Sequence, residues 1–367
     1  MAAIIKAKET MSARERVERT FAFEKTDRVT IGYDTNGFIH AKLCAALGVR
    51  PEDRRALDDA LGVDYTGINA TFTGKNPYPE KPDRHVDVLE GCYMRWVPNQ
   101  YGGYWDFCDF PLKDAEDEEF DNYPIPSPDD FDYDAALSQA KALSGRYALY
   151  VGHAGVPDII NSNGRIMGME DVLVHLMLED GAAMDFMRRR AKSQLEVMYR
   201  TIEKCRDYLS FVWLGEDLGT QRTPMISLEL YRKVMKPIHK QFIDLANSYG
   251  LPVMIHTCGC SSWVYEDFIE MGVRGVDSLQ PEAVNMSPDY LLDHFSGRLT
   301  LRGFISTAGP LAYGTAEEVD EYCRKTLEKC MPHRGYHFAP SHAIQDNSPV
   351  ENVLAMYQAA HKYGVYE

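Results

Sequence analysis

Two residues with metal-binding side chains stand close together in the segment LPVMIHTCGC. His256 and Cys258 are two positions apart at the end of an apolar run, and residues two apart in a β-strand point to the same face. An imidazole and a thiolate side by side suit zinc. Cys260 is a possible further ligand, although Gly259 is expected to turn the chain before it. The alternative is that Cys258 is a small apolar core residue without a metal.

A third ligand is predicted in the segment FAPSHAIQDNSPVEN. His342 lies just past the end of an apolar run there. If both runs are strands of one barrel, their terminal loops converge over its mouth, so His342 can approach His256 and Cys258. The alternative is a loop histidine that hydrogen-bonds to nearby backbone groups.

Two carboxylates follow another apolar run, in FVWLGEDLGTQ. Glu216 and Asp217 are predicted to supply a general acid or an extra metal ligand. The alternative for either one is a cap on the segment that follows. Further polar residues after apolar runs are predicted to contact the substrate: Asp34, Asn36, His153, Gln221, Asp277 and Gln280.

These side chains need a scaffold that brings strand ends together, and the chain carries eight short apolar runs typical of strands. Amphipathic helical stretches alternate with the later runs, which predicts a parallel sheet. Eight such units predict a (β/α)8 TIM barrel; a doubly wound sheet is the alternative. The expected strands are 28–33, 64–69, 147–152, 209–214, 252–257, 273–279, 298–304 and 335–340, and the expected helices after the third are 169–179, 183–207, 228–249, 263–271, 288–294, 316–329 and 350–363.

The whole chain, 1–367, is expected to form this one domain, with two additions. A helical N-terminal extension is expected over 12–23, with Ser12 as its cap. The stretch 71–134 is expected to be an inserted excursion after an early strand, at the catalytic end of the barrel. It combines a hairpin-like segment, CYMRWVPNQYGGYWDF, with an acidic, proline-rich segment that has no helical period.

The composition excludes several classes of function. The formal net charge is −16 over 367 residues, without a long basic run, so nucleic acid is an unfavourable partner. No apolar run is long enough to span a membrane, the N-terminus has no signal-peptide pattern, and the eight cysteines are scattered. A cytoplasmic protein with reduced thiols is expected. Glycine-rich dinucleotide loops, P-loops and nucleophile elbows are absent from the sequence.

With these residues identified, the chain resembles the uroporphyrinogen decarboxylase superfamily and, within it, the zinc-dependent corrinoid methyltransferases. The matching segments run in order along the chain: RERVERTFAFEKTDRV, GEDLGTQ, VMIHTCG, GVDSLQPEAVNM, YGTAEEV and FAPSHAIQDNSPVENVLAMYQAA. The resemblance implies a (β/α)8 barrel, in agreement with the strand count.

Two features separate the branches of this superfamily. Decarboxylases of the family hold substrate carboxylates with an arginine-rich loop after the first strand, whereas this chain reads IGYDTNGFIHAKL there, without arginine. The methyltransferases bind zinc through H-x-C and a later cysteine. His256 and Cys258 match the first two positions, and Ser341-His342 stands at the third. One thiolate and two imidazoles would leave a zinc site with a net charge of +1, which suits polarising a neutral oxygen.

The resemblance therefore implies a methyltransferase that demethylates a small methoxylated molecule, with an aromatic methyl ether as the expected donor, and passes the methyl group to the Co(I) of a partner corrinoid protein. Asp217 or Glu216 would protonate the departing oxygen. Two alternatives remain open: a metal-free lyase that decarboxylates a small acid with Asp34, Asp217 and His342, and a barrel that only binds a small ligand.

Overall fold

Eight parallel strands form the centre of the protein, which is described by a computed structural model over residues 3–179 and 181–366. Each strand expected from the sequence overlaps one observed strand, and the predicted (β/α)8 barrel is confirmed. Neighbouring strands pair in the order β1-β13-β12-β11-β10-β9-β8-β2. Their bounds are β1 Thr30–Ile31, β2 Tyr65–Gly67, β8 Ala148–Pro157, β9 Leu209–Gly215, β10 Val253–His256, β11 Gly275–Leu279, β12 Thr300–Ile305 and β13 Tyr336–Pro340.

The barrel is closed between β1 and β2 by a single residue. The backbone of Asp64 donates to Ile31 O (3.0 Å), and its carboxylate accepts from Ile31 N (2.7 Å). The same carboxylate pairs with the guanidinium groups of Arg16 and Arg28, and all three side chains are buried. Because buried charges are tolerated only when they are paired, this network fixes the closure of the barrel.

Helix α1, Ala13–Phe21, plugs one end of the barrel. It begins at Ser12, whose side chain accepts a hydrogen bond from Glu15 N, as the sequence predicts. Val17 and Phe21 pack against Tyr65, Phe211 and other side chains of the barrel interior. The interior at this end is therefore a packed core rather than a pore.

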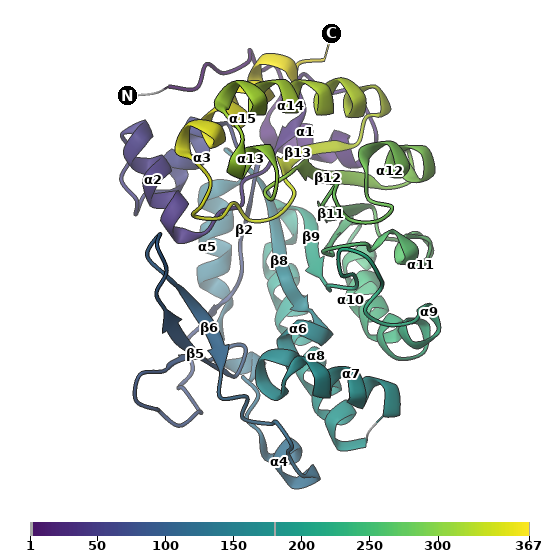
Figure 1. The fold of residues 1–367 in the computed structure, drawn as a ribbon. Coiled ribbons are helices and arrows are strands. Elements are labelled where there is room, and N and C mark those ends of the chain that lie inside the picture. Colours follow the sequence, from purple (N-terminus) through teal and green to yellow (C-terminus); the bar gives the residue numbers. More distant parts are fainter. Residues whose placement is uncertain (1–2, 180, 367) are drawn as a thin grey trace.

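Helices surround the strands (Figure 1). Their ends carry ordinary capping signals, such as the capping box of Thr315 and Glu318 at the start of α14 and the left-handed Gly272 at the end of α11. The helices are α2 Gly37–Leu47, α3 Arg54–Leu61, α5 Tyr133–Leu143, α6 Ile159–Met167, α7 Met169–Leu178, α8 Gly181–Cys205, α9 Leu228–Leu230, α10 Lys236–Ser248, α11 Tyr265–Met271, α12 Pro288–Phe295, α13 Pro310–Tyr313, α14 Ala316–Cys330 and α15 Val350–Tyr363.

Between β2 and α5 the chain leaves the barrel. β3, Thr71–Phe72, pairs with β7, Phe131–Asp132, and between them β4, β5 and β6 form an antiparallel sheet. The bounds of these three strands are His85–Asp87, Cys92–Val97 and Tyr104–Cys108. Figure 1 shows this sheet at the end of the barrel toward which β8 and β9 point.

The acidic part of this excursion contains a short helix that the sequence does not predict. Helix α4, Asp117–Asn122, has a capping box formed by Glu116 and Glu119, and its Phe120 is buried. With six residues, this helix is too short to show a helical repeat of apolar residues in the sequence. It forms because acidic side chains favour a helix N-terminus and one aromatic ring is buried.

Candidate metal centre

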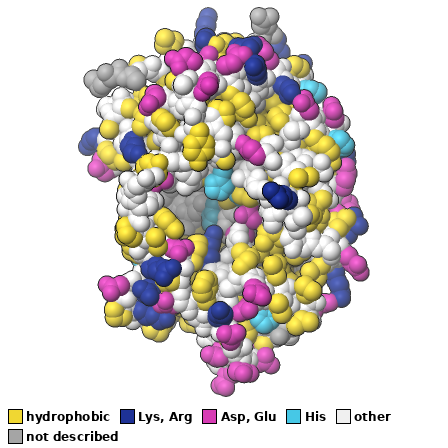
Figure 2. All heavy atoms as spheres, viewed as in Figure 1, with side chains coloured by type: hydrophobic (Ala, Val, Ile, Leu, Met, Phe, Trp, Pro, Cys, Tyr) yellow, Lys and Arg dark blue, Asp and Glu magenta, His cyan; other side chains and the backbone are white. Residues whose placement is uncertain are grey.

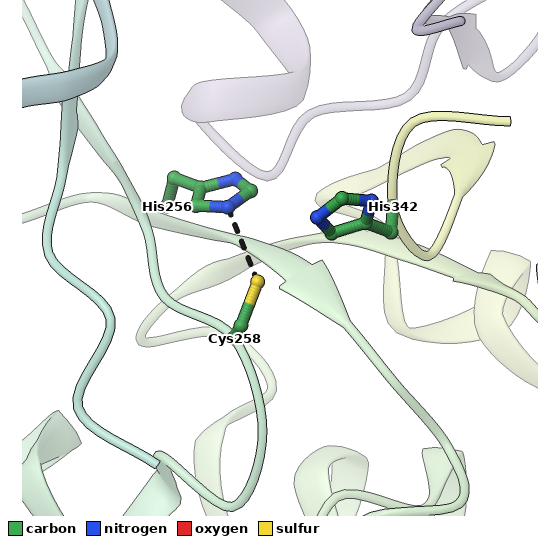
Figure 3. A group of neighbouring side chains, drawn as sticks. All are labelled: His256, Cys258 and His342. Carbon is green, nitrogen blue, oxygen red and sulfur yellow. Dashed lines mark hydrogen bonds between the residues drawn. The ribbon is translucent and has the colours of Figure 1, made fainter. Parts of the chain in front are cut away.

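The three predicted ligands converge at the mouth of the barrel. Viewed as in Figure 1, the molecule is hollowed beside the hairpin β5–β6, and a histidine side chain is exposed at the rim (Figure 2). His256 ends β10, Cys258 follows in the next loop, and His342 comes from the loop after β13; their ligand atoms all lie within 4.8 Å of one another. His256 Nε2 and Cys258 Sγ are 3.3 Å apart, and Figure 3 shows both histidine rings directed toward the sulfur.

This arrangement fits zinc. One thiolate and two imidazole nitrogens within this distance can occupy three corners of a tetrahedron, which leaves the fourth corner for a substrate atom. The free nitrogen of His256 also faces the group, since its other nitrogen is engaged elsewhere. Catalytic zinc sites commonly have three protein ligands and one open position.

The loop after β10 is held in place by hydrogen bonds to its backbone. Cys258 N donates to Asp217 Oδ1 (2.8 Å), and Gly259 N donates to Gln280 Oε1 (2.8 Å). Gly259 has a positive φ of 69°, and a Cβ there would lie 2.3 Å from Gly219 O. Only glycine therefore fits, and the reversed chain carries Cys260 into the core, where it is 5% exposed and outside the ligand group.

Asp277 holds His256 in its orientation. Its Oδ2 lies 2.8 Å from His256 Nδ1, and its Oδ1 pairs with the guanidinium of Arg302. Although burial opposes its ionisation, the Arg302 charge keeps the pKa of Asp277 well below its usual range. The sequence predicts a substrate contact for Asp277; instead its carboxylate is fully buried behind the histidine, as in carboxylate–histidine–zinc arrangements.

Arg302 is a member of this site that sequence reasoning missed. It lies in the middle of β12, is fully buried, and also donates to Tyr65 OH (2.7 Å). The signal was a charged residue inside an apolar strand, LTLRGF. Such a residue requires a buried partner, because an unpaired charge in a core is costly.

Replacing Asp277 by asparagine should weaken zinc binding about 10- to 100-fold, the usual cost of removing a hydrogen-bonding partner of a metal-bound histidine. The neutral amide is a weaker acceptor for the Nδ1 proton and leaves Arg302 without its paired carboxylate. Competition of zinc-loaded protein with a chromophoric chelator measures the affinity. The control is Asp267→Asn, which removes a similarly buried, ion-paired carboxylate in α11. An equal loss of zinc affinity in both variants would contradict this role.

Without a metal, the side chains of the ligand group shift one another's pKa. Burial alone would raise the pKa of Cys258, but the charge of His256 lowers it. Burial alone would lower the pKa of His256, but Cys258 raises it well above its usual range. The hydrogen bond to Cys258 raises the pKa of His342. A metal cation would take the place of these protons, since ligands must be deprotonated to bind it.

The two adjacent carboxylates have different surroundings. Asp217 Oδ1 lies 3.8 Å from His256 Nε2, and its Oδ2 accepts from Asn161 Nδ2 (2.8 Å). Although burial opposes it, the charge of His256 lowers the pKa of Asp217. Asp217 therefore borders the ligand group as an anion.

Glu216 is turned away from this group. Its carboxylate accepts from Ile159 N (2.6 Å) and Ile160 N (2.9 Å) at the start of α6 and lies 3.0 Å from His239 Nε2. The side chain is fully buried, and burial raises the pKa of Glu216 to about 8. Of the two predicted carboxylates, Asp217 therefore lies beside the ligand group, whereas Glu216 binds the first two backbone N–H groups of α6.

The remaining predicted substrate contacts are of three kinds. Gln221 donates to Gln280 (3.0 Å), so both amides support the loop of Cys258. Asn36 caps α2 by accepting from Ile39 N (3.0 Å), and Asp34 O accepts from Ile344 N (2.9 Å). Asn36 is thus a structural residue, while Asp34 stands at the mouth beside the loop of His342.

His153 belongs to a different cavity. Its Nδ1 accepts from Gly155 N (3.0 Å). Together with residues of β8, α8 and the excursion, it lines a space of about 140 Å³. His256, Cys258 and His342 do not line this space. His153 therefore lies apart from the ligand group of His256, Cys258 and His342.

Comparison with known proteins gives two kinds of match. Residues 182–363 match the family model described as uroporphyrinogen decarboxylase (URO-D). Among solved structures, a methyltransferase from Methanosarcina mazei has a TM-score of 0.67 at 14% identity, covering 96% of this chain and 99% of that chain. At this identity the match shows a shared fold.

Other comparisons add little. A sugar phosphate isomerase/epimerase from Parabacteroides distasonis has a TM-score of 0.30 at 12% identity and covers 62% of this chain and 88% of that chain. No curated protein sequence matches the chain. Within residues 3–179 and 181–366, none of the helices combines the length and apolar character that crossing a membrane requires.

Proposed function

Because the chain belongs to the uroporphyrinogen decarboxylase superfamily, we propose that it is a zinc-dependent methyltransferase. In this proposal it moves a methyl group from a small methoxylated molecule to the Co(I) of a partner corrinoid protein. The observation that carries the proposal is the convergence of His256, Cys258 and His342, with Asp277 behind the first of them. The shared fold with a methyltransferase from Methanosarcina mazei supports the same class of reaction.

Zinc bound by these side chains would supply a Lewis acid for the ether oxygen. Neighbouring residues of the chain hold the ligands in position. Asp277 and Arg302 keep His256 Nε2 directed at the mouth, and Asp217 holds the Cys258 backbone. These contacts preorganise the ligands before substrate arrives, which lowers the cost of binding a metal in one geometry.

In the reaction, the bond between the methyl carbon and the oxygen breaks. The oxygen keeps the electron pair and takes a proton, and the methyl group passes to cobalt(I), which provides the electron pair of the new bond. Asp217 is an anion whose side chain is 25% exposed and lies 3.8 Å from His256 Nε2, so it is placed to orient a solvent water that donates this proton. Glu216 is fully buried against α6 and His239, away from solvent.

The test is metal content together with methyl transfer. The purified chain should carry about one zinc, one for each three-ligand group. With free cob(I)alamin as acceptor and 2-methoxyphenol as donor, the zinc-loaded chain should methylate cob(I)alamin and release catechol. The reaction is followed by the fall in cob(I)alamin absorbance. Removal of the metal by a chelator should abolish the reaction, and added zinc should restore it.

The opposite result is equally informative. A chain that takes up no zinc on reconstitution at neutral pH would have no Lewis acid, and the proposal would fail in favour of a metal-free lyase. If the chain binds zinc but transfers no methyl group from any methoxylated donor, the proposed metal site would be supported and the proposed reaction contradicted.

A further inference from the structure

The hairpin β5–β6 carries an aromatic face. Trp96 pairs directly with Trp105, and Met94 pairs with Phe107 on the neighbouring strand. Since residues two apart in a strand share a face, these four side chains lie on the same side of the sheet. The two indole rings are in contact, with centroids 5.4 Å apart and planes at 71°.

This face is turned toward the mouth of the barrel. The ring of Phe107 lies under the guanidinium of Arg165 in α6, at 4.7 Å, and Trp96 contacts Phe38 in α2, with centroids 6.2 Å apart. α2 follows β1 and α6 follows β8, so the hairpin is attached to two separate parts of the mouth. In Figures 1 and 2 the hairpin borders the hollow on that face of the molecule.

The face is also continuous with the ligand group. Thr35, just before α2, pairs with Ile344, two residues after His342. A path of direct neighbours therefore leads from the loop of His342 to Phe38 and on to Trp96. Phe38 and the loop of His342 therefore both lie where two neighbouring strands, β1 and β13, end.

Both tryptophans keep much of their surface free: Trp96 is 44% exposed and Trp105 is 48% exposed. Single exposed apolar side chains are ordinary on protein surfaces. Here, however, two large rings are in contact with each other and both remain exposed, although Trp105 also contacts the ring of His85. Indole rings stack on flat aromatic ligands with little loss of conformational entropy.

We infer that Trp96 and Trp105, with Phe38, form an aromatic wall that binds the planar ring of the substrate. The wall selects methoxylated arenes over aliphatic methyl ethers. This inference rests on the proposed methyl transfer and names the substrate class of the same site. The ring lies against the wall while its methoxy oxygen reaches the ligand group.

The experiment measures binding to the full zinc-loaded chain by calorimetry, with 2-methoxyphenol and 2-methoxyethanol as probes. The double variant Trp96→Ala/Trp105→Ala should bind 2-methoxyphenol with an affinity about tenfold lower, the scale of two lost aromatic contacts. The affinity for 2-methoxyethanol should not change. The matched control is Tyr104→Ala: Tyr104 adjoins Trp105, is 51% exposed, and lies on the opposite face of the hairpin. This control should bind both probes as the unaltered chain does.

Three outcomes would overturn the inference. The double variant could bind 2-methoxyphenol unchanged, or lose both probes equally. Alternatively, it could keep the affinity for 2-methoxyphenol but require more corrinoid protein for half-maximal transfer, which would assign the face to that partner. Zinc content and the melting temperature of each variant separate these outcomes from misfolding. Because binding is measured without turnover, failure of the wall is distinguishable from failure of the methyl-transfer reaction.

Discussion

Replacing Cys258 by alanine is expected to leave the purified chain without stoichiometric zinc, with an affinity lowered by more than about 100-fold. That loss should exceed the effect of removing a residue that only supports a ligand. Cys258 supplies the thiolate of the group, and its Sγ lies 3.3 Å from His256 Nε2. Two imidazoles without a thiolate hold zinc weakly, because the anionic ligand provides much of the attraction.

The same loop provides a matched control for this variant. Cys260→Ala removes a thiol two residues away that is buried in the core, where burial raises the pKa of Cys260. It should retain full zinc. Metal analysis of the two variants beside the unaltered chain measures the difference. Equal retention of zinc by the Cys258 and Cys260 variants would show that the ligand group does not bind the metal.

The contrast between these two cysteines shows how far sequence reasoning reaches. Two residues at the end of a strand can be assigned to one face from their spacing alone, which places His256 and Cys258 together. The expected turn at Gly259 separates Cys260 from them, and its positive φ accounts for the turn. His342 needed the fold as well, because only a barrel brings the loops of β10 and β13 over one mouth.

The strands themselves were predictable because of where they lie. All seven residues of β9 are buried, and strands of a barrel covered by helices read as continuous apolar runs. β2 was the least distinct, since only three residues pair and its neighbour β1 contributes two. Closure at this point depends on Asp64, a side chain outside any apolar pattern.

The roles of polar residues after a strand were harder to predict. Asp277 lies within β11 and Glu216 directly follows β9, yet one is directed at His256 and the other at α6. Sequence spacing places a side chain near a strand end without specifying what packs behind it. The aromatic face of the hairpin was hidden for a related reason. The register that pairs Trp96 with Trp105 depends on a long loop containing Gly102 and Gly103.

The ion-pair network that closes the barrel predicts a large loss of stability when Asp64 is removed. Replacing Asp64 by alanine should lower the free energy of unfolding by about 3–5 kcal/mol, the cost of removing one partner from a buried ion pair. The carboxylate accepts from Arg28 Nη1 (2.7 Å) and Nη2 (3.0 Å), from Arg16, and from Ile31 N (2.7 Å). Without it, the two buried guanidinium groups would retain, among the described residues, Asp27 and Glu9 as counter-charges, and Glu9 is 38% exposed.

Urea unfolding followed by tryptophan fluorescence measures this loss. The matched control is Asp185→Ala, because Asp185 is 67% exposed and pairs with Arg188 on the surface of α8. Exposed ion pairs contribute about 0–1 kcal/mol, so the control should unfold close to the unaltered chain. If both variants unfold at the same urea concentration, the closure of the barrel does not depend on Asp64. A large loss for Asp64 alone would show that the strands forming the mouth are held together from the opposite end of the barrel, where Asp64 binds Ile31 of β1 and pairs with Arg16 of α1.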